Sequence, residues 1–208
     1  MSIQINYKSL YLNKNLNNFV LFVDENFNIT GLKKYLSKSD YYFIDDLLKI
    51  NDKKKDVLFF DINSKKKIIL VSYKKNITDS ETESLGAKFY DNIKEIKQNN
   101  FIINSDITKS ISKKFIGHFL HGIKLKSYIF EKYKSKKSIK KMTITVIGKN
   151  LTPKADQLKF KAIEDGTFFA RDLVSEPGNI LHPDEYAKRL NSLKKVGLKI
   201  NVYDEKKL

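Results

Sequence analysis

Hydrophobic and polar residues follow two different periods along the chain, which predicts short strands interleaved with helices. Strict alternation over residues 3–7 is typical of a half-buried strand, and the continuous apolar run 19–23 is typical of a buried one. Two further apolar runs flank the polar turn Asn63-Ser64-Lys65 and predict a β-hairpin. Strands are expected at residues 3–7, 19–23, 57–62, 67–73, 101–103, 142–147 and 198–202.

Between these strands, apolar residues recur at helical spacing. Asp79 is expected to cap one helix, and Pro153, preceded by the capping residue Thr152, to start another. Helices are expected over residues 32–50 (in two pieces), 79–97, 108–123, 153–174 and 183–197, the last closed by Gly197. The predicted buried faces carry Phe43, Leu47 and Ile50; Leu85, Phe89, Ile93 and Ile96; Ile111, Phe115, Phe119 and Ile123; Ala155, Leu158, Ala162, Phe169 and Leu173; and Tyr186, Leu190 and Leu193.

This order of elements predicts an α/β fold in two parts. Residues 1–150 are expected to form one domain, a mixed sheet flanked by helices. Residues 151–208 are expected to form a linker helix and the helix–strand start of a second domain. Because a helix, a helix and a strand cannot enclose a core, we expect the chain to stop in the middle of an architecture.

Composition indicates which cellular compartment to expect for the protein. The 208 residues are 41% hydrophobic, enough to bury a core, and include no cysteine, which excludes disulfides and thiolate metal sites. A reducing compartment, the cytoplasm, is therefore expected. Residues 1–11 contain no apolar run of signal-peptide length, and no run approaches the roughly 18 residues of a membrane span, so no membrane association is expected.

A formal net charge of +16 indicates either an anionic partner such as nucleic acid or a lysine-rich codon bias. The bias is favoured, because only Arg171 and Arg189 are arginines and the lysines are spread along the chain. Aromatic residues interleaved with lysines at 125–137 could stack on bases and contact phosphates, or could anchor a loop while the lysines stay solvated. The candidate nucleic-acid contacts are Tyr128, Lys132, Tyr133, Lys134, Lys136 and Lys137.

Catalytic patterns are scarce. His118 and His121 are three residues apart on a predicted helix and could share a metal, but no nearby ligand pattern completes the site, and a helix surface or interface is favoured. His182 is expected to cap a helix or pack in a loop. The sequence has no Gly-rich phosphate loop, no Gly-x-Ser-x-Gly motif and no His-Glu-x-x-His motif.

Residues 168–183 (Phe-Phe-Ala-Arg-Asp-Leu-Val-Ser-Glu-Pro-Gly-Asn-Ile-Leu-His-Pro) closely resemble the ARDLVNEPPNxLxP signature of the leucyl aminopeptidase (cytosol aminopeptidase) family. Ser175 and Gly178 depart mildly from it. Residues 128–137 are similar to the family's YRFDKYKTKK stretch. The signature residues, interpreted as structural supports of a helix end and the following loop, are Arg171, Asp172, Glu176, Pro177, Asn179 and Pro183.

The resemblance implies an N-terminal domain similar to macro domains, joined by a long helix to a catalytic domain. Intact members release N-terminal amino acids from peptides with two divalent metals, zinc or manganese, and assemble as hexamers. The metal-binding motifs VGKGxTFDSGG and NTDAEGRL do not occur in this sequence, so no catalytic residue, metal ligand or bound cofactor is expected. We expect a structural or oligomerisation role without peptidase activity. The alternatives are a basic DNA-binding module and, ranked last, a macro-domain-like binder of ADP-ribose.

Overall fold

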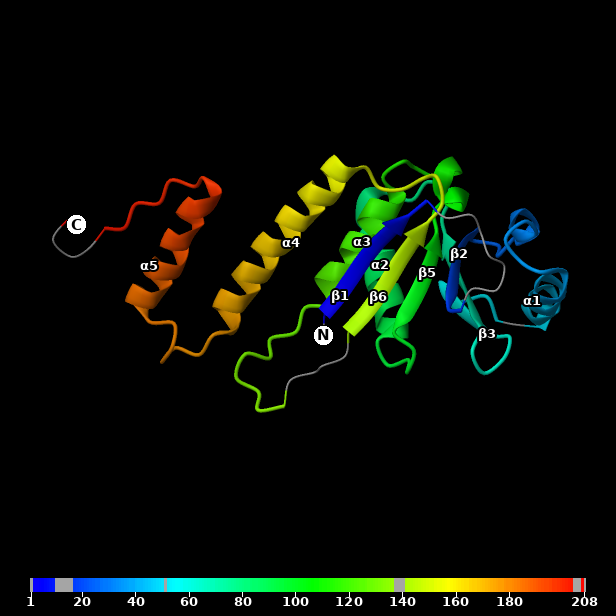
Figure 1. Ribbon diagram of the computed structural model, residues 1–208, viewed down its shortest axis with the longest axis horizontal. Helices are drawn as coiled ribbons and strands as arrows, with labels where there is room; N and C mark the ends of the chain where they lie inside the picture. The colour runs from blue at the N-terminus through cyan, green and yellow to red at the C-terminus, as the bar shows by residue number, and fades with distance from the viewer. Residues whose placement is uncertain (1, 10–16, 51, 137–140, 204–206, 208) are drawn as a thin grey trace. The chain divides into compact units, whose positions relative to one another are not determined.

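The computed structural model describes residues 2–9, 17–50, 52–136, 141–203 and 207. It confirms an α/β fold with a single six-stranded mixed sheet in the order β1-β6-β5-β2-β4-β3 (Figure 1). All neighbouring strands run parallel except β3 and β4, which form the predicted antiparallel hairpin. The strands are β1 Ser2–Lys8, β2 Phe19–Asp24, β3 Val57–Asp61, β4 Lys67–Tyr73, β5 Asn100–Asn104 and β6 Lys141–Ile147.

Five α-helices and three 3₁₀ turns accompany the sheet in the described part of the chain. The helices are α1 Lys38–Ile50, α2 Asp79–Ile93, α3 Phe115–Lys126, α4 Lys154–Ser175 and α5 Pro183–Asn191. The 3₁₀ turns are η1 Thr30–Leu32, η2 Asp106–Ser110 and η3 Ser192–Val196. None of the described helices is long and apolar enough to cross a membrane.

The chain divides into two compact units, residues 1–164 and residues 165–208. The first unit contains the whole sheet, and the second contains the end of α4 followed by α5 and η3. The boundary predicted near residue 150 stays a prediction.

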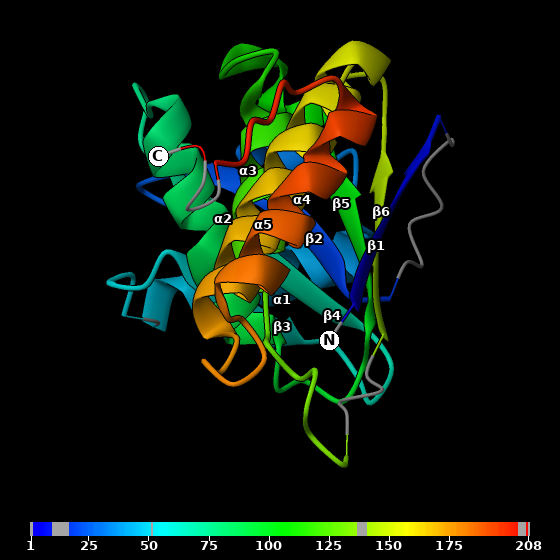
Figure 2. The ribbon, with the colours of Figure 1, turned by 90° about the vertical axis from the view of Figure 1, so that its left-hand side faces the viewer.

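Two apolar clusters lie on opposite faces of the sheet, and β2 contributes to both because successive strand side chains point to opposite sides. Val20 and Phe22 pack in the cluster that includes α2 and α3, whereas Phe19, Leu21 and Val23 pack in the cluster that includes η1 and α1. Figure 2 shows α2 and α3 together on one side of the strands. The continuous apolar run of β2 is therefore explained by burial on both faces.

Helices α2 and α3 approach each other closely because each contributes a glycine to the contact. A Cβ atom built on Gly86 would lie 2.0 Å from the carbonyl oxygen of Phe119, and one on Gly122 would lie 1.9 Å from that of Glu83. Backbone therefore touches backbone at both positions. The aromatic rings of Phe22, Phe115 and Phe119 then fill the space between these helices and the sheet.

The predicted start of α2 at residue 79 is correct, but its predicted cap is wrong, and the starts of α1, α3 and α4 lie later than predicted. Helix α2 is capped by Thr78 and not by Asp79, because Thr78 and Glu81 form a reciprocal capping box. Helix α1 begins at Lys38 instead of residue 32, and α3 begins at Phe115 instead of residue 108, each preceded by a 3₁₀ turn. Helix α4 begins at Lys154, one residue after the predicted start.

The predicted face of α1 is correct only for Leu47, which is half-buried and packs against the core. Asp40, Ile44 and Leu48 are its buried residues, while Phe43 is 43% and Ile50 is 83% exposed. Asp40 lies inside because its carboxylate pairs with the Lys66 ammonium at 2.6 Å, with both side chains almost covered. The buried face of α1 thus combines the apolar residues Ile44 and Leu48 with a carboxylate that is paired to a residue of the β3–β4 turn.

Two predictions fail in the C-terminal part of the chain. Residues 198–203 form no strand, and Leu198, Val202 and Tyr203 are exposed, since the described residues of their unit include no strand with which to pair. On α4, the predicted inward residues Ala155, Leu158 and Ala162 are exposed, and the buried residue is Glu164. In contrast, the predicted stripe of α2 is confirmed, and Gly197 closes the last helical turn in the left-handed conformation.

Candidate functional site

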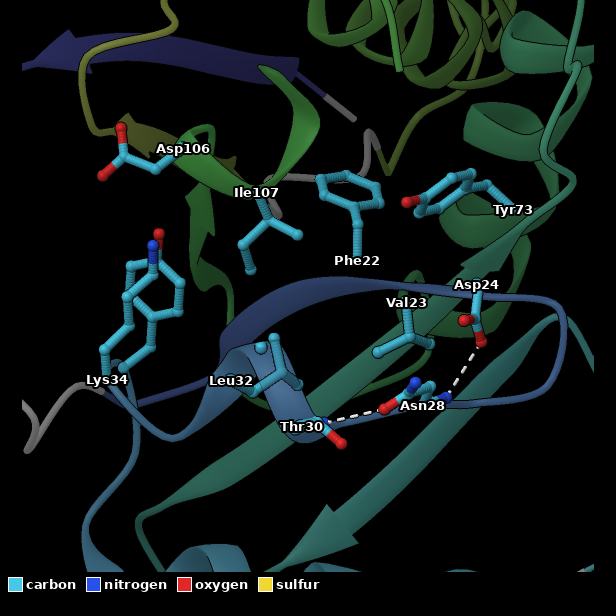
Figure 3. A pocket seen from close by; sticks show the side chains of 12 residues that line it. Phe22, Val23, Asp24, Asn28, Thr30, Leu32, Lys34, Tyr73, Asp106 and Ile107 are labelled. Atoms are coloured by element: carbon cyan, nitrogen blue, oxygen red, sulfur yellow. Dashed lines mark hydrogen bonds between the residues drawn. The ribbon is translucent and has the colours of Figure 1, made fainter. Parts of the chain in front are cut away.

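The principal cavity of interest lies at the carboxyl ends of β2, β4 and β5 and has a volume of about 610 Å³ (Figure 3). Strands β2 and β5 are neighbours, yet the connection after β2 leads toward β3 and β4 while the connection after β5 leads to β6 on the other side. In open α/β sheets, ligands bind in the crevice outside such a reversal of strand order. The fold alone therefore identifies this cavity as the place where a ligand site is expected.

A tightly organised loop after β2 forms one wall. Oδ1 of Asp24 accepts hydrogen bonds from the backbone N–H groups of Asn26 at 3.1 Å and Asn28 at 2.9 Å. Oδ1 of Asn28 in turn accepts from the N–H of Thr30 at 3.0 Å. Phe27 has a positive φ of 56° and a buried side chain, an unfavourable backbone state for a bulky residue that the surrounding contacts must maintain. The loop therefore has one defined shape.

The opposite wall comes from the segment after β5. Oδ1 of Asp106 accepts the backbone N–H of Lys149 at 2.6 Å, which ties η2 to the turn after β6. Gly148 makes this approach possible, because it has a φ of 119° and a Cβ atom there would lie 2.7 Å from Oδ1 of Asp106. Both carboxylates of the cavity are thus held by main-chain donors, and each has a second oxygen that these bonds do not use.

Apolar residues also line the cavity. Phe22, Val23 and Leu32 are almost completely buried, and Tyr73 ends β4 directly beside Asp24 in the sheet register. Lys34 lies at the edge of the cavity, with its ammonium 4.7 Å from the ring centroid of Tyr35. The hydrogen bond to Tyr35 is the main cause that raises the pKa of Lys34, which stays charged. Sequence patterns did not identify this site, because its parts come from three separate strand ends.

The two histidines of α3 form contacts with carboxylates in place of a metal site. Nδ1 of His118 lies 2.8 Å from Glu83 and its Nε2 lies 3.2 Å from Asp79, both on α2, while Nδ1 of the buried His121 lies 3.1 Å from Glu164. The Phe160 ring lies 5.0 Å from both imidazoles, measured between centroids. The favoured interpretation of an interface, here between helices, is therefore correct for both residues.

Among the described residues, no group of three or more His, Cys, Asp or Glu side chains could hold a metal ion. The described residues therefore do not fit the two divalent metals that the family resemblance implies.

The signature residues all lie in the second unit, and one of them, Glu176, forms a buried ion pair. Glu176, whose side chain is 1% exposed, accepts a bond from Nη1 of Arg189 at 2.7 Å, and Nε of Arg189 bonds Glu185 at 3.0 Å. The two carboxylates raise the pKa of Arg189 further above its usual range, and Arg189 lowers the pKa of Glu185. Sequence reasoning included Glu176 but missed Arg189, which lies beyond the signature on α5.

The other signature residues lie at the end of α4, in the turn after it and at the start of α5. The Pro177 carbonyl accepts the N–H groups of Ile180 and Leu181, which turns the chain between α4 and α5. Pro183 is the first residue of α5, and His182 occupies the N-cap position without a side-chain capping bond. Arg171 is half-buried, whereas Asp172 and Asn179 are exposed, and the N–H of Glu176 bonds the Asp172 carbonyl at 3.1 Å. Their role as structural supports stays a prediction.

The candidate nucleic-acid residues lie in the segment between α3 and β6. Tyr133 is 51% exposed, its ring lies 5.9 Å from that of Phe130, and the Lys132 ammonium lies 5.6 Å from its centroid. Lys134 and Lys136 are exposed and Tyr128 is half-buried, while Lys137 falls outside the described residues.

Sequence comparison with known proteins finds cytosol aminopeptidases as relatives of this chain. No family model matches the chain. A probable cytosol aminopeptidase of Clostridium perfringens (strain 13 / Type A) is 31% identical over 141 residues, which cover 64% of this chain and 29% of that protein. One from Chelativorans sp. (strain BNC1) is 38% identical over 94 residues, covering 42% and 19%. The chain thus spans less than a third of the length of these relatives.

Solved structures show the same fold. A mutant tomato leucine aminopeptidase superposes with a TM-score of 0.75 at 17% identity, covering 99% of this chain and 45% of that one. The bottromycin maturation enzyme BotP in complex with Mn gives 0.64 at 14% identity, covering 92% and 39%. The chain is therefore an α/β protein, and its fold is that of one part of leucine aminopeptidase. The chain is homologous to the cytosol (leucyl) aminopeptidase family, and its partial coverage of the relatives is consistent with their N-terminal region.

Proposed function

We propose that this chain is the N-terminal part of a leucyl-aminopeptidase-like protein and acts as a structural or assembly component without peptidase activity of its own. The observation that carries the proposal is the match to relatives over only 19–29% of their length, together with the signature at residues 168–183, whose Glu176 pairs with Arg189 of α5. In an intact relative, peptide hydrolysis with two zinc or manganese ions would then belong to a separate catalytic domain. Hexamer-like self-assembly and a cytoplasmic location belong to the same proposal.

A leucine p-nitroanilide assay tests the first part of this proposal. The purified chain, supplied with Mn²⁺ or Zn²⁺, is expected to release no nitroaniline above the buffer rate, because an activated water and a polarised carbonyl require metal ligands. An intact cytosol aminopeptidase under the same conditions is the positive control. Metal-dependent turnover by the chain, or two ions bound per chain at stoichiometric occupancy, would show that the proposal is wrong.

A DNA-binding module is the second candidate, favoured by the exposed Tyr133 with Lys132, Lys134 and Lys136 beside it in sequence. If about four lysines contact phosphates, the logarithm of the association constant should fall against the logarithm of salt concentration with a slope of roughly −3 to −4. Fluorescence anisotropy with a labelled duplex measures this slope.

A charge-matched control identifies the surface. Replacing Lys132, Lys134 and Lys136 with Gln should weaken binding and reduce the slope. The same change at the exposed residues Lys53, Lys54 and Lys55 should have much less effect. Equal losses of DNA affinity in both triple variants would mean that binding depends on the overall charge and not on this segment. No DNA binding at low salt would eliminate the candidate.

A further inference from the structure

A second cavity, with a volume of about 560 Å³, lies beside the amino ends of β2, β4 and β5, at the end of the strands opposite to the cavity described above. Three segments that are distant in sequence line it: residues 17–18 before β2, residues 64–65 in the turn between β3 and β4, and residues 98–102 at the start of β5. Its volume falls in the range of small-molecule sites. The function proposed above assigns this cavity no role, so a ligand bound there would be independent of that function.

Hydrogen bonds hold the walls of this second cavity in one shape. Asn18 is 3% exposed and has a φ of 48°, a left-handed conformation that asparagine tolerates better than most residues. Its Nδ2 donates to the carbonyl oxygen of Asn100 at 2.8 Å, and its own carbonyl accepts the N–H of Ile102 at 3.1 Å. In the turn between β3 and β4, Oδ1 of Asn63 accepts the N–H of Lys65 at 2.9 Å. A ligand would therefore meet walls that are already ordered.

The side chains that offer surface to a ligand are mostly uncharged amides and a hydroxyl. Asn17, Ser64 and Asn100 are exposed and Gln98 is half-buried, and the bonds that hold the walls do not use their side chains. Each carboxamide carries two donors and an acceptor oxygen, and a serine hydroxyl both donates and accepts. Lys65 has the one charged side chain among the described residues that line the cavity. The surface therefore suits a ligand whose own groups both donate and accept.

This chemistry argues against three other classes of ligand. A metal ion or an amine would find no carboxylate among the described lining residues. An anion such as phosphate would find one ammonium, on the exposed Lys65, where solvent screening leaves little attraction. A flat aromatic ligand would find little apolar surface, because Ile102 is the one apolar residue of the same set. The class that matches is a molecule rich in neutral hydroxyl groups.

From this arrangement we propose that the cavity binds a small uncharged sugar. The sugar hydroxyls accept hydrogen bonds from the amides of Asn17, Gln98 and Asn100 and donate to their carbonyl oxygens. Ser64 adds a hydroxyl from the turn between β3 and β4, and the half-buried Ile102 packs against the carbon-bound hydrogens of the sugar ring. Because these hydrogen bonds replace bonds to water, the net gain from each is small, and the expected affinity is weak.

Saturation-transfer NMR of the full chain with glucose, galactose, mannose and maltose tests the proposal. We expect at least one of these sugars to bind at millimolar concentration, and isothermal titration with that sugar to show saturable one-to-one binding. Succinate, a small dianion, is the comparison ligand and should bind at least tenfold more weakly. Succinate binding as tight as that of the best sugar would mean that charge is recognised. That result, or no binding of any of the four sugars up to millimolar concentration, overturns the proposal.

Alanine variants then locate the site. Gln98→Ala combined with Asn100→Ala removes two of the amides and keeps the main-chain carbonyl that accepts the Asn18 bond. This double variant is expected to weaken binding of the best sugar at least tenfold. Asn76→Ala removes an amide from an exposed residue that does not line the cavity and should leave binding unchanged. Equal affinities of the two variants, each shown to be folded by circular dichroism, would also overturn the proposal.

Discussion

Alanine at position 122 is expected to lower the free energy of unfolding by about 3 kcal/mol or more, at the upper end of overpacking effects. The Cβ atom would lie 1.9 Å from the carbonyl oxygen of Glu83 and 2.7 Å from its carbonyl carbon. These are backbone atoms of α2, so no side-chain rotation relieves the contact and the two helices must separate. Separation would also loosen the Phe22, Phe115 and Phe119 rings that fill the core below them.

Urea unfolding followed by circular dichroism measures the effect, since the chain has no tryptophan to serve as a fluorescent reporter. For a protein of this size, a loss of about 3 kcal/mol corresponds to a fall in Tm of roughly 6–12 °C. Gly86→Ala should behave similarly, because its Cβ atom would lie 2.0 Å from the Phe119 carbonyl oxygen.

The matched control for these substitutions is Gly166→Ala in α4. No atom lies within 4 Å of the added Cβ atom, and alanine favours a helix over glycine by about 1 kcal/mol. The control should therefore leave the protein as stable as before or slightly more stable. If Gly122→Ala unfolded at the same urea concentration as the unchanged protein, the close approach of α2 and α3 would be wrong.

Sequence patterns predicted the fold where burial itself sets the pattern. The runs of β2 and β4 are apolar throughout because both faces of these central strands are covered, and the hairpin of β3 and β4 follows from its polar turn. The start of α2 at residue 79 was also predicted, although the cap is Thr78, whose spacing to Glu81 is that of a capping box, and not the predicted Asp79.

Sequence patterns failed where contacts between distant residues decide. The buried side of α1 includes Asp40, which pairs with the distant Lys66, and the buried side of α4 includes Phe160 and Glu164, which contact the histidines of α3. The local periodicity of apolar residues cannot predict either of these long-range contacts. The cavity was missed for the same reason, because Asp24 and Asp106 line one cavity only when β2 and β5 pair. The signature segment was identified by resemblance, whereas the pairing of Glu176 with Arg189 is visible only in the structure.

Replacing Arg189 with methionine is expected to destabilise α5 most among single substitutions in the second unit. Helix α5 has nine residues, none of them fully buried, and a helix of that length is marginal without outside contacts. Arg189 supplies such contacts, bonding Glu176 before the turn and Glu185 within the helix. Its loss would leave the covered Glu176 carboxylate without this cation, which is far more costly than loss of an exposed pair.

Hydrogen exchange measured by mass spectrometry gives the readout, with the strands of the first unit as an internal reference. In Arg189→Met, we expect amide exchange in α5 to rise by roughly a hundredfold while the reference strands keep their protection. Glu185→Gln, which removes only the more exposed partner, should raise exchange by a few-fold at most. Adding Glu176→Gln to Arg189→Met should recover part of the protection, because the carboxylate that lost the Arg189 guanidinium is then replaced by a neutral amide. If Arg189→Met and Glu185→Gln instead had equal effects, the buried pair would not be what holds α5 to the end of α4.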